Sequence, residues 1–233
     1  MARGKIIGSV SYQALEDAFA AELAEVANGP GGRTWVLVPT NLLALHLRRE
    51  AARRIGGLLG VGFLTLKDAA RRMAQPFLAS GGRRPVPAGA IELVLQRLLD
   101  GVPDGSYFAA FRRFSNGAPA IERTFKLLQN CLWTPEALRQ AIEIAEFRDP
   151  GAARRMRELA GIWADLEKWK QEKGLFDGDD LILAAGRDDV APADHPQVLL
   201  IYGFYDLNPA QRALAGRLIA TAERCTAFLL WDE

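Results

Sequence analysis

The 233-residue chain is 49% hydrophobic and 24% charged with a formal net charge of +1, which is ordinary for a soluble globular protein and excludes a strong overall field. Its two cysteines are far apart and its two histidines are isolated, so we expect neither a disulfide framework nor a metal site. No apolar run approaches transmembrane length and the N-terminus lacks the apolar core of a signal peptide, so we expect a cytoplasmic protein without a membrane partner.

The first third of the chain alternates between strand-like and helix-like patterns. Three short runs rich in β-forming residues predict strands, at residues 5–8, 34–38 and 61–64. Each run is followed by an amphipathic helical pattern. Ser11 is placed to cap the first helix, and Thr65 with Asp68 resembles a capping box for the third. This alternation predicts a doubly wound parallel sheet.

The middle of the chain, residues 81–174, contains no convincing strand pattern. Helices are predicted at residues 88–99, 108–114, 118–128, 135–147 and 150–174. The last of them carries an apolar stripe at helical spacing, made of Met156, Leu159, Trp163, Leu166 and Trp169. These side chains could form either a platform for stacking nucleic-acid bases or part of a hydrophobic core, and we favour the core.

The sheet pattern resumes after residue 174. A buried parallel strand begins at Val198 and is bounded by Gly203, the pair Asn208-Pro209 begins a helix, and residues 226–231 form a fifth strand. We therefore predict an α/β fold with a parallel sheet flanked by helices. The sheet is built from residues 1–78 and 175–233, and an all-helical insertion, residues 79–174, interrupts it. In open α/β sheets, ligands bind at loops leaving the carboxyl ends of the strands.

The loop after the strand at Val198 carries a recognisable pattern. Residues 201–211 read IYGFYDLNPAQ, which resembles the Walker B segment of UvrD-like helicases, V-D-E-F-Q-D-T-N-P-x-Q. The shared frame consists of Phe204, Asp206, Asn208, Pro209 and Gln211. Tyr202 and Gly203 stand where those helicases have the magnesium-binding aspartate and the catalytic glutamate. The resemblance therefore implies a RecA-like helicase motor domain that has lost its ATPase function.

Three further segments resemble the same helicases in the same order. The sequence VLVPTN at residues 36–41, followed by a helix ending in arginines, resembles the motif that touches single-stranded DNA. FLTLK at residues 63–67 resembles the step that places another DNA-contacting threonine, and DGDDL at residues 177–181 resembles the D-F-D-D-L element after the helical insertion. The resemblance implies a nucleic-acid-binding set of Thr40, Asn41, Arg48, Arg49 and Thr65.

Within this superfamily, residues 7–54 look most like the AddB type. AddB proteins are subunits of bacterial helicase–nuclease complexes that process double-strand breaks, with a helicase-like N-terminal half and a nuclease C-terminal half. The resemblance implies a role in DNA repair and recombination, with an AddA-like helicase as partner. No nuclease motif is visible, so that half is absent or lies beyond Glu233. The chain ends directly after an apolar segment, which is compatible with a fragment of a longer protein.

The expected nucleotide site is degenerate. A phosphate-binding loop needs several glycines, a lysine for the phosphates and a hydroxyl for magnesium. After the first strand the chain has GSVSYQA at residues 8–14, without a second glycine or a lysine. The degenerate site comprises Gly8, Ser9, Ser11, Tyr202 and Gly203. We expect no catalytic residue, no ATP hydrolysis and no cofactor, although the helix start near Ser11 retains the physical ability to bind phosphate.

Charged residues gather in two places. Between residues 33 and 84 there are ten basic and two acidic residues, and ten minus two gives a local charge of +8. This favours an anionic partner, and the alternative is a solvated pair of arginine-rich helices. The second group consists of Asp177, Asp179 and Asp180. Because the downstream glutamate of a calcium loop is missing, helix capping and solvation are favoured over a metal cluster.

Three functions fit these patterns. The leading hypothesis is a non-catalytic scaffold that binds single-stranded DNA, a partner helicase, or both. The second is a divergent ATPase that binds nucleotide through unfamiliar residues. The third is a protein-interaction module with no affinity for DNA. The sequence does not separate the first hypothesis from the third.

Overall fold

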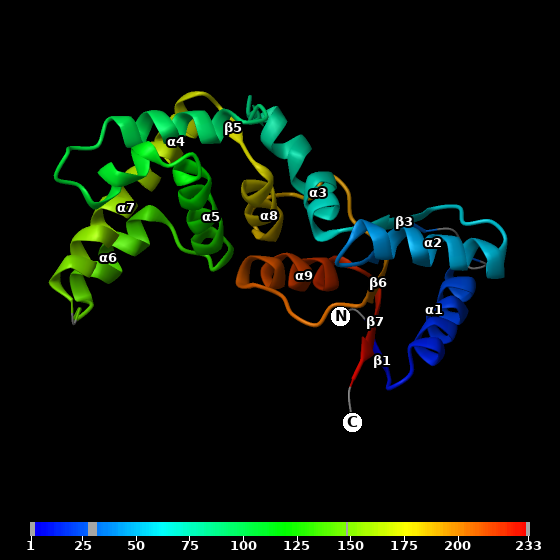
Figure 1. Ribbon diagram of the computed structural model, residues 1–233. Helices are drawn as coiled ribbons and strands as arrows, with labels where there is room; N and C mark the ends of the chain where they lie inside the picture. Colours follow the sequence, from blue (N-terminus) through cyan, green and yellow to red (C-terminus); the bar gives the residue numbers. More distant parts are fainter. Residues whose placement is uncertain (1–2, 28–31, 148, 232–233) are drawn as a thin grey trace. The chain divides into compact units, whose positions relative to one another are not determined.

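The computed structural model describes residues 3–27, 32–147 and 149–231, and the chain divides into two compact units (Figure 1). The first unit combines Met1–Leu78 with Asp180–Glu233, and the second is Ala79–Asp179. The first unit contains the large sheet and the second is mostly helical.

The first unit is built on a five-stranded sheet in the order β1-β7-β6-β2-β3. Its strands are β1 (Arg3–Ser9), β2 (Thr34–Leu37), β3 (Val61–Leu64), β6 (Val198–Tyr202) and β7 (Arg224–Leu230). All four neighbouring pairs are parallel. The structure thus confirms the predicted α/β fold, a parallel sheet flanked by helices that is consistent with a RecA-like, helicase-like fold.

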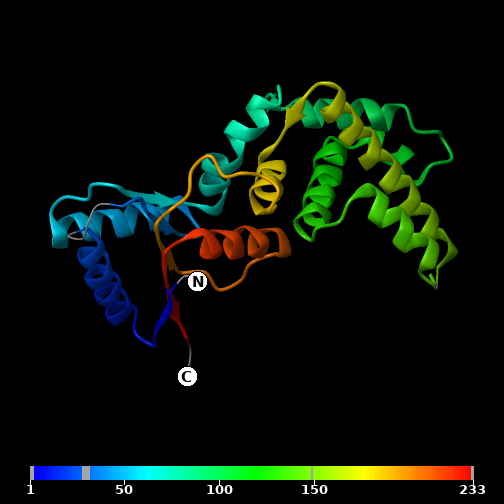
Figure 2. The ribbon, with the colours of Figure 1, turned by 180° about the vertical axis from the view of Figure 1, so that it is seen from behind.

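Helices lie on both sides of these strands. They are α1 (Tyr12–Ala27), α2 (Asn41–Ile55), α3 (Leu66–Ser80), α8 (Gly178–Gly186) and α9 (Pro209–Thr221). Figure 1 and Figure 2 show α1 and α9 on opposite sides of the strands. The core between α1, α2 and the sheet includes Phe19, Leu47 and Phe228, which are buried.

Local sequence signals determine where these helices begin. The Thr40 hydroxyl oxygen accepts a hydrogen bond from the Leu43 N–H (3.2 Å), so Thr40 caps α2. At α9, Asn208 accepts from the Gln211 N–H (2.9 Å) and the Gln211 side chain accepts from the Asn208 N–H (3.1 Å), which completes a capping box. The predicted capping box of Thr65 and Asp68 is also present at the start of α3.

A buried carboxylate fastens α1 to the sheet. Glu22 is 4% exposed, and its oxygens accept hydrogen bonds from Lys5 Nζ (3.0 Å), Thr226 Oγ1 (3.1 Å) and Arg224 Nη2. Burial raises the pKa of Glu22, but the hydrogen bonds from Lys5 and Arg224 lower it more, so the net pKa lies below the ordinary 4.5. The ionised form is therefore the one that stabilises the fold.

This network predicts acid-sensitive stability. Because the folded-state pKa of Glu22 is depressed, its contribution is present above the unfolded value of 4.5 and is lost as the pH falls through the folded-state pKa. We expect Glu22→Gln to lower the free energy of unfolding by about 1–3 kcal/mol at pH 7. The difference should shrink when urea denaturation is repeated at acidic pH. A difference that stays constant below pH 4.5 would contradict this account.

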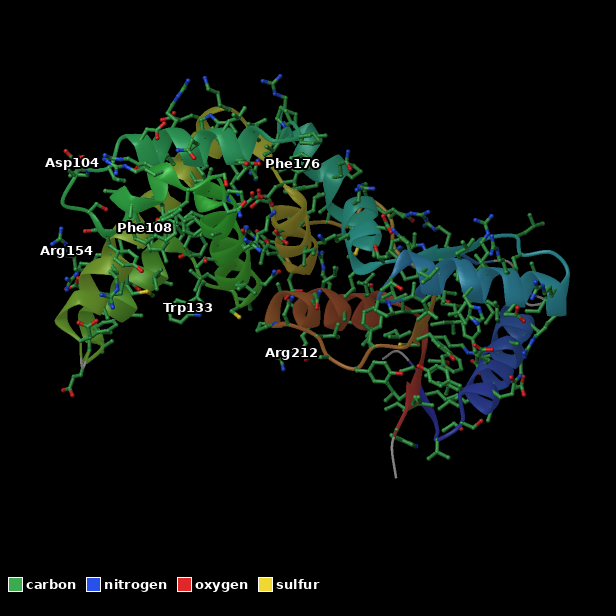
Figure 3. All side chains as sticks on the ribbon, viewed as in Figure 1. Asp104, Phe108, Trp133, Arg154, Phe176 and Arg212 are labelled. Atoms are coloured by element: carbon green, nitrogen blue, oxygen red, sulfur yellow. The ribbon has the colours of Figure 1, made fainter. Side chains whose placement is uncertain are left out.

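The second unit consists of helices around a core of its own. Its elements are α4 (Ala90–Asp100), the 3-10 helix η1 (Tyr107–Arg113), α5 (Gly117–Asn130), α6 (Pro135–Ile144) and α7 (Pro150–Glu172). Figure 3 shows Phe108 among these helices, and its side chain is buried. The predicted stripe on α7 is core: Trp163 is 2% exposed and stacks on Phe125, with ring centroids 5.5 Å apart. The base-stacking alternative for this stripe is therefore wrong.

One short strand in this unit contradicts the prediction that residues 81–174 contain none. β4 (Arg84–Pro85) pairs in parallel with β5 (Leu175–Phe176). Two backbone hydrogen bonds hold the pair, from the Arg84 N–H to the Gly174 oxygen and from the Val86 N–H to the Phe176 oxygen, both 2.8 Å. A two-residue strand is too short to produce an alternating pattern, which is why periodicity missed it.

Candidate nucleic-acid interface

A pocket of about 370 Å³ lies where three adjacent strands of the sheet end. Its lining comes from the loops after β2, β3 and β6 and from the first residues of the helices that follow them. It consists of Pro39, Thr40, Asn41, Thr65, Leu66, Lys67, Phe204, Asp206 and Gln211. The fold therefore brings together three of the five residues predicted to bind nucleic acid, Thr40, Asn41 and Thr65. It also joins them to the Walker B-like loop, because β6 is the neighbour of β2.

Arg48 and Arg49, the other two predicted residues, do not line this pocket. Both are exposed and lie further along α2. Among the described residues, neither guanidinium forms an ion pair. Their role in DNA binding stays a prediction.

Thr40 and Thr65 differ in the hydrogen bonds that they can still offer to a ligand. Thr40 accepts from a backbone N–H with its oxygen, so its hydroxyl proton remains able to donate. Thr65 donates its hydroxyl proton to Asp68 Oδ2 (2.7 Å), so it orders the start of α3 and has less to offer a ligand. We therefore assign Thr65 mainly to the shape of the pocket and Thr40 to its hydrogen-bonding surface.

Three helix starts and one cation make this pocket favourable for an anion. α2, α3 and α9 all begin beside it, and the first N–H groups of a helix carry partial positive charge. Lys67 is exposed and has no ion pair within the described parts of the chain. Asp206 is the carboxylate in the lining, and Phe204 adds an aromatic ring.

Lys67 was missed in the prediction of site residues. Its sequence signal is its position two residues after Thr65, at the start of a helix that follows a strand. This signal becomes informative only when the sheet order is known, because the order places the loop after β3 beside the loops after β2 and β6.

The serines predicted for the degenerate nucleotide site take part in local hydrogen bonds. Ser9 Oγ accepts a hydrogen bond from the Ser11 N–H (3.0 Å), and Ser11 Oγ accepts from the Ala14 N–H at 3.4 Å. The indole of Trp231 lies against Gly8, so that a Cβ at this position would overlap the ring. Packing of Trp231 therefore accounts for the glycine at position 8.

Tyr202 belongs to the core between the sheet and α1. Its ring is 2% exposed and lies 5.3 Å from the Phe19 ring in an edge-to-face arrangement. Burial, followed by the nearby charge of Glu16, raises the pKa of Tyr202 to about 12. The hydroxyl has no hydrogen-bond partner among the described residues. A neutral phenol therefore occupies the position at which the resemblance would place a magnesium-binding aspartate.

Gly203, the neighbouring position, has a backbone that disfavours a side chain. Its φ is +76°, and an added Cβ would lie 2.9 Å from Leu43 Cδ2. The predicted nucleotide site has one part at the end of β1, at residues 8–11, and another at the end of β6, at residues 202–203. One strand, β7, lies between β1 and β6 in the sheet.

In the acidic segment at residues 177–180, the side chain of Asp177 has a structural role. Asp177 Oδ1 accepts from the Asp179 N–H (2.9 Å), and Asp177 Oδ2 lies 3.3 Å from the buried Lys170 Nζ. The capping interpretation is confirmed, but solvation is wrong for Asp177, whose side chain is 16% exposed. Because Lys170 lies on the preceding helix, on the other side of a turn, no local pattern signalled this pair.

The parallel sheet flanked by helices makes this an α/β protein whose fold is consistent with a RecA-like, helicase-like fold. No protein-family model matches the chain. The chain is similar to an ATP-dependent helicase/deoxyribonuclease subunit of Moorella thermoacetica, with 26% identity over 221 residues. The match covers 90% of this chain and 19% of the relative, so the chain spans about a fifth of that protein's length. This similarity supports an AddB-like relationship. None of the described helices has the length and apolar character needed to cross a lipid bilayer.

Proposed function

We propose that this chain is an inactivated helicase-like domain of a helicase–nuclease subunit that acts in DNA double-strand-break repair. It serves as a non-catalytic scaffold that binds single-stranded DNA. The observation that carries the proposal is the pocket at the carboxyl ends of β6, β2 and β3, which unites Thr40 and Asn41 with Lys67. The name of the Moorella relative, a helicase/deoxyribonuclease subunit, supports the same process.

The chemistry of the pocket suits a nucleic-acid strand. Lys67 and the starts of three helices attract a phosphate, while Asn41 and Gln211 offer both hydrogen-bond donors and acceptors. Phe204 supplies a ring on which a base can stack. Arg48 and Arg49 extend the basic surface along α2 and contact neighbouring phosphates.

Loss of the motor is supported by packing as well as by sequence. Tyr202 is integrated into the core, Gly203 has positive φ, and Trp231 lies against Gly8. No group in these positions replaces a lysine for the phosphates or acids for magnesium and water. The chain therefore contributes binding and shape, without hydrolysing ATP and without a cofactor.

The relationship supports a proposal for the wider assembly. We propose that the sheet-containing unit is the RecA-like core, residues 1–78 and 175–233, and that residues 79–174 form the insertion subdomain. We also propose that the partner is an AddA-like helicase and that the complex works in the cytoplasm. The name of the relative, which is one subunit of an enzyme, supports the existence of a partner subunit.

Fluorescence anisotropy of a labelled single-stranded oligonucleotide tests the DNA site. We expect binding that weakens as salt rises and is indifferent to Mg-ATP. Lys67→Gln should weaken binding several-fold and reduce the slope of log affinity against log salt by about 0.7, the value for one phosphate contact on a single strand. The matched control is Arg33→Gln. Arg33 immediately precedes β2, at the amino end of the strand, and should leave binding unchanged.

Three outcomes would overturn the proposal. Absence of binding at low salt would favour a protein-interaction module without DNA affinity. Binding that is insensitive to salt, or equally weakened by both substitutions, would place the DNA elsewhere. Binding that changes with Mg-ATP would favour the divergent ATPase.

A further inference from the structure

The two edges of the five-stranded sheet differ in length. At one edge lies β3, which has four residues and therefore offers few backbone groups to another chain. At the other edge lies β1, which has seven residues and pairs with β7 one residue to one along its whole length (Figure 1). Short strands and bulges are devices that keep a sheet edge from pairing with other chains. β1 has neither device.

The composition of β1 does not protect its edge either. Edge strands are often protected by proline or by a charged side chain that faces an incoming strand. Within residues 4–9 there is no proline, and Lys5 is the charged residue. Its Nζ donates a hydrogen bond to Glu22 Oε2 on α1 at 3.0 Å, so a buried carboxylate already neutralises its charge. The edge of β1 is therefore open to pairing.

Alternate backbone groups of β1 point away from the sheet. The Ser9 oxygen accepts a hydrogen bond from the Trp231 N–H (3.2 Å), so the backbone of Ser9 faces the β7 side. Because successive residues of a strand alternate in direction, Gly4, Ile6 and Gly8 turn their N–H and C=O groups to the free edge. β1 is the last strand in the order of the described sheet, so a strand from another chain can take up these groups.

The face of β1 that is remote from α1 is apolar and exposed. Lys5 and Ile7 lie on the face that α1 covers, since Lys5 contacts α1 and Ile7 packs against the core that includes it. On the other face, Ile6 is 68% exposed. The ring of Trp231 lies on the same face, over Gly8, and is 53% exposed. An occupant of this edge gains apolar contacts on this face.

Gly4 lies two residues before Ile6, as Gly8 lies two residues after it. A glycine inside a strand weakens the strand and often marks the close approach of another group. Packing of Trp231 accounts for Gly8. Gly4 has no such neighbour within the described chain, because an added Cβ would meet nothing within 4 Å, and its φ is not positive. The single chain therefore gives no reason for a glycine at position 4.

We propose that a second copy of this chain occupies the edge, with the two β1 strands antiparallel about a two-fold axis at Ile6. In this register Ile6 is opposite Ile6 of the second copy, and Gly4 is opposite Gly8 of the second copy. Each of these pairs exchanges two backbone hydrogen bonds. The Trp231 ring that covers Gly8 in one copy then extends over Gly4 of the other, which accounts for the missing side chain at position 4.

Charge and size define the strength of this contact. The register places Lys5 opposite Ile7 of the second copy, so the two lysines do not face each other. A contact built from one strand of each copy, with Ile6 and Trp231 as its apolar part, buries less than the roughly 1,200 Å² of a stable interface. The dimer is therefore weak and dissociates on dilution. The inference does not depend on the proposed DNA site, which is lined by the segments after β2, β3 and β6.

Sedimentation velocity over a series of protein concentrations tests the proposal. The unmodified chain should pass from monomer to dimer as its concentration rises. Ile6→Lys brings two like charges together at the axis, and Gly4→Phe fits the single chain but collides with Trp231 of the second copy. Each should raise the dissociation constant at least about tenfold. Leu59→Lys, at a position that is 94% exposed in another loop, and Lys67→Gln should leave it unchanged.

Oxidative cross-linking tests the register. Directly opposite residues of a hydrogen-bonded antiparallel pair have Cα atoms about 5.5 Å apart, which suits a disulfide. Ile6→Cys should therefore form a cross-linked dimer on mild oxidation. The experiment uses a Cys131→Ser background, since Cys131 is exposed, whereas the other cysteine is buried. Leu59→Cys in the same background is the control and should stay monomeric.

Three results would overturn the proposal. A chain that stays monomeric at the highest concentration would leave the edge of β1 to a strand of a different protein. A dimer that survives Ile6→Lys, or that cross-links as readily through Leu59→Cys as through Ile6→Cys, would use another surface. A dimer that is unaffected by Gly4→Phe would not have Trp231 over Gly4. Circular dichroism of each variant verifies that the monomer is folded.

Discussion

Tyr202→Asp is expected to destabilise the protein by about 3–5 kcal/mol and to restore no ATPase activity. The substitution removes a ring that packs against Phe19 and Phe228 and leaves a carboxylate in its place. The carboxylate would have no cation beside it in the core, so it would either stay protonated or unfold the unit. Urea denaturation followed by circular dichroism measures the loss, and a phosphate-release assay measures the activity.

Tyr202→Phe provides the matched control. It keeps the ring and removes a buried hydroxyl that has no partner among the described residues, so stability should be unchanged or raised by about 1 kcal/mol. A Tyr202→Asp variant that folds normally and hydrolyses ATP would refute the assignment of this position to the core. A large loss of stability in Tyr202→Phe would show that the hydroxyl has a structural partner.

Trp163→Ala is expected to lower the free energy of unfolding of the helical unit by about 3–5 kcal/mol. Trp163 stacks on Phe125 and is buried in the core of that unit with Leu159 and Leu166. Removal of the indole leaves a cavity that the surrounding helices can fill only in part. Urea denaturation with far-UV circular dichroism reports the change.

Trp133→Ala is the companion measurement. Trp133 is 38% exposed, so its removal should cost less than the removal of the buried Trp163. Single-stranded DNA affinity is to be measured for both variants under conditions where each is folded. If Trp163→Ala left stability intact and reduced DNA affinity, the stripe on α7 would have to be reassigned as a base-stacking platform.

Elements with strong local signals were predictable from the sequence. All five strands of the sheet were recognised, because each is a compact run of β-forming residues. The starts of α3 and α9 were recognised from Thr65 and Asn208, whose side chains satisfy the first N–H groups of each helix. These features depend only on residues within a few positions of one another.

Features that depend on distant residues were not predictable. The order of the sheet decides that Lys67 joins Thr40 at one pocket, and no local pattern encodes that order. The contact between Trp231 and Gly8 depends on β1 and β7 being neighbours. The ion pair of Lys170 and Asp177 likewise joins α7 to the residue that precedes α8.

The pairing of β1 has a consequence for how the protein is made. Within the described sheet, the neighbour of β1 is β7, so the strand that is synthesised first pairs with the one that is synthesised last. A ribosome must deliver every residue between Arg3 and Arg224 before this pairing can form, and closing so long a loop is slow. During that interval the backbone edge of β1 that later pairs with β7 is available to other chains. Synthesis therefore exposes an aggregation-prone segment that chaperones have reason to guard.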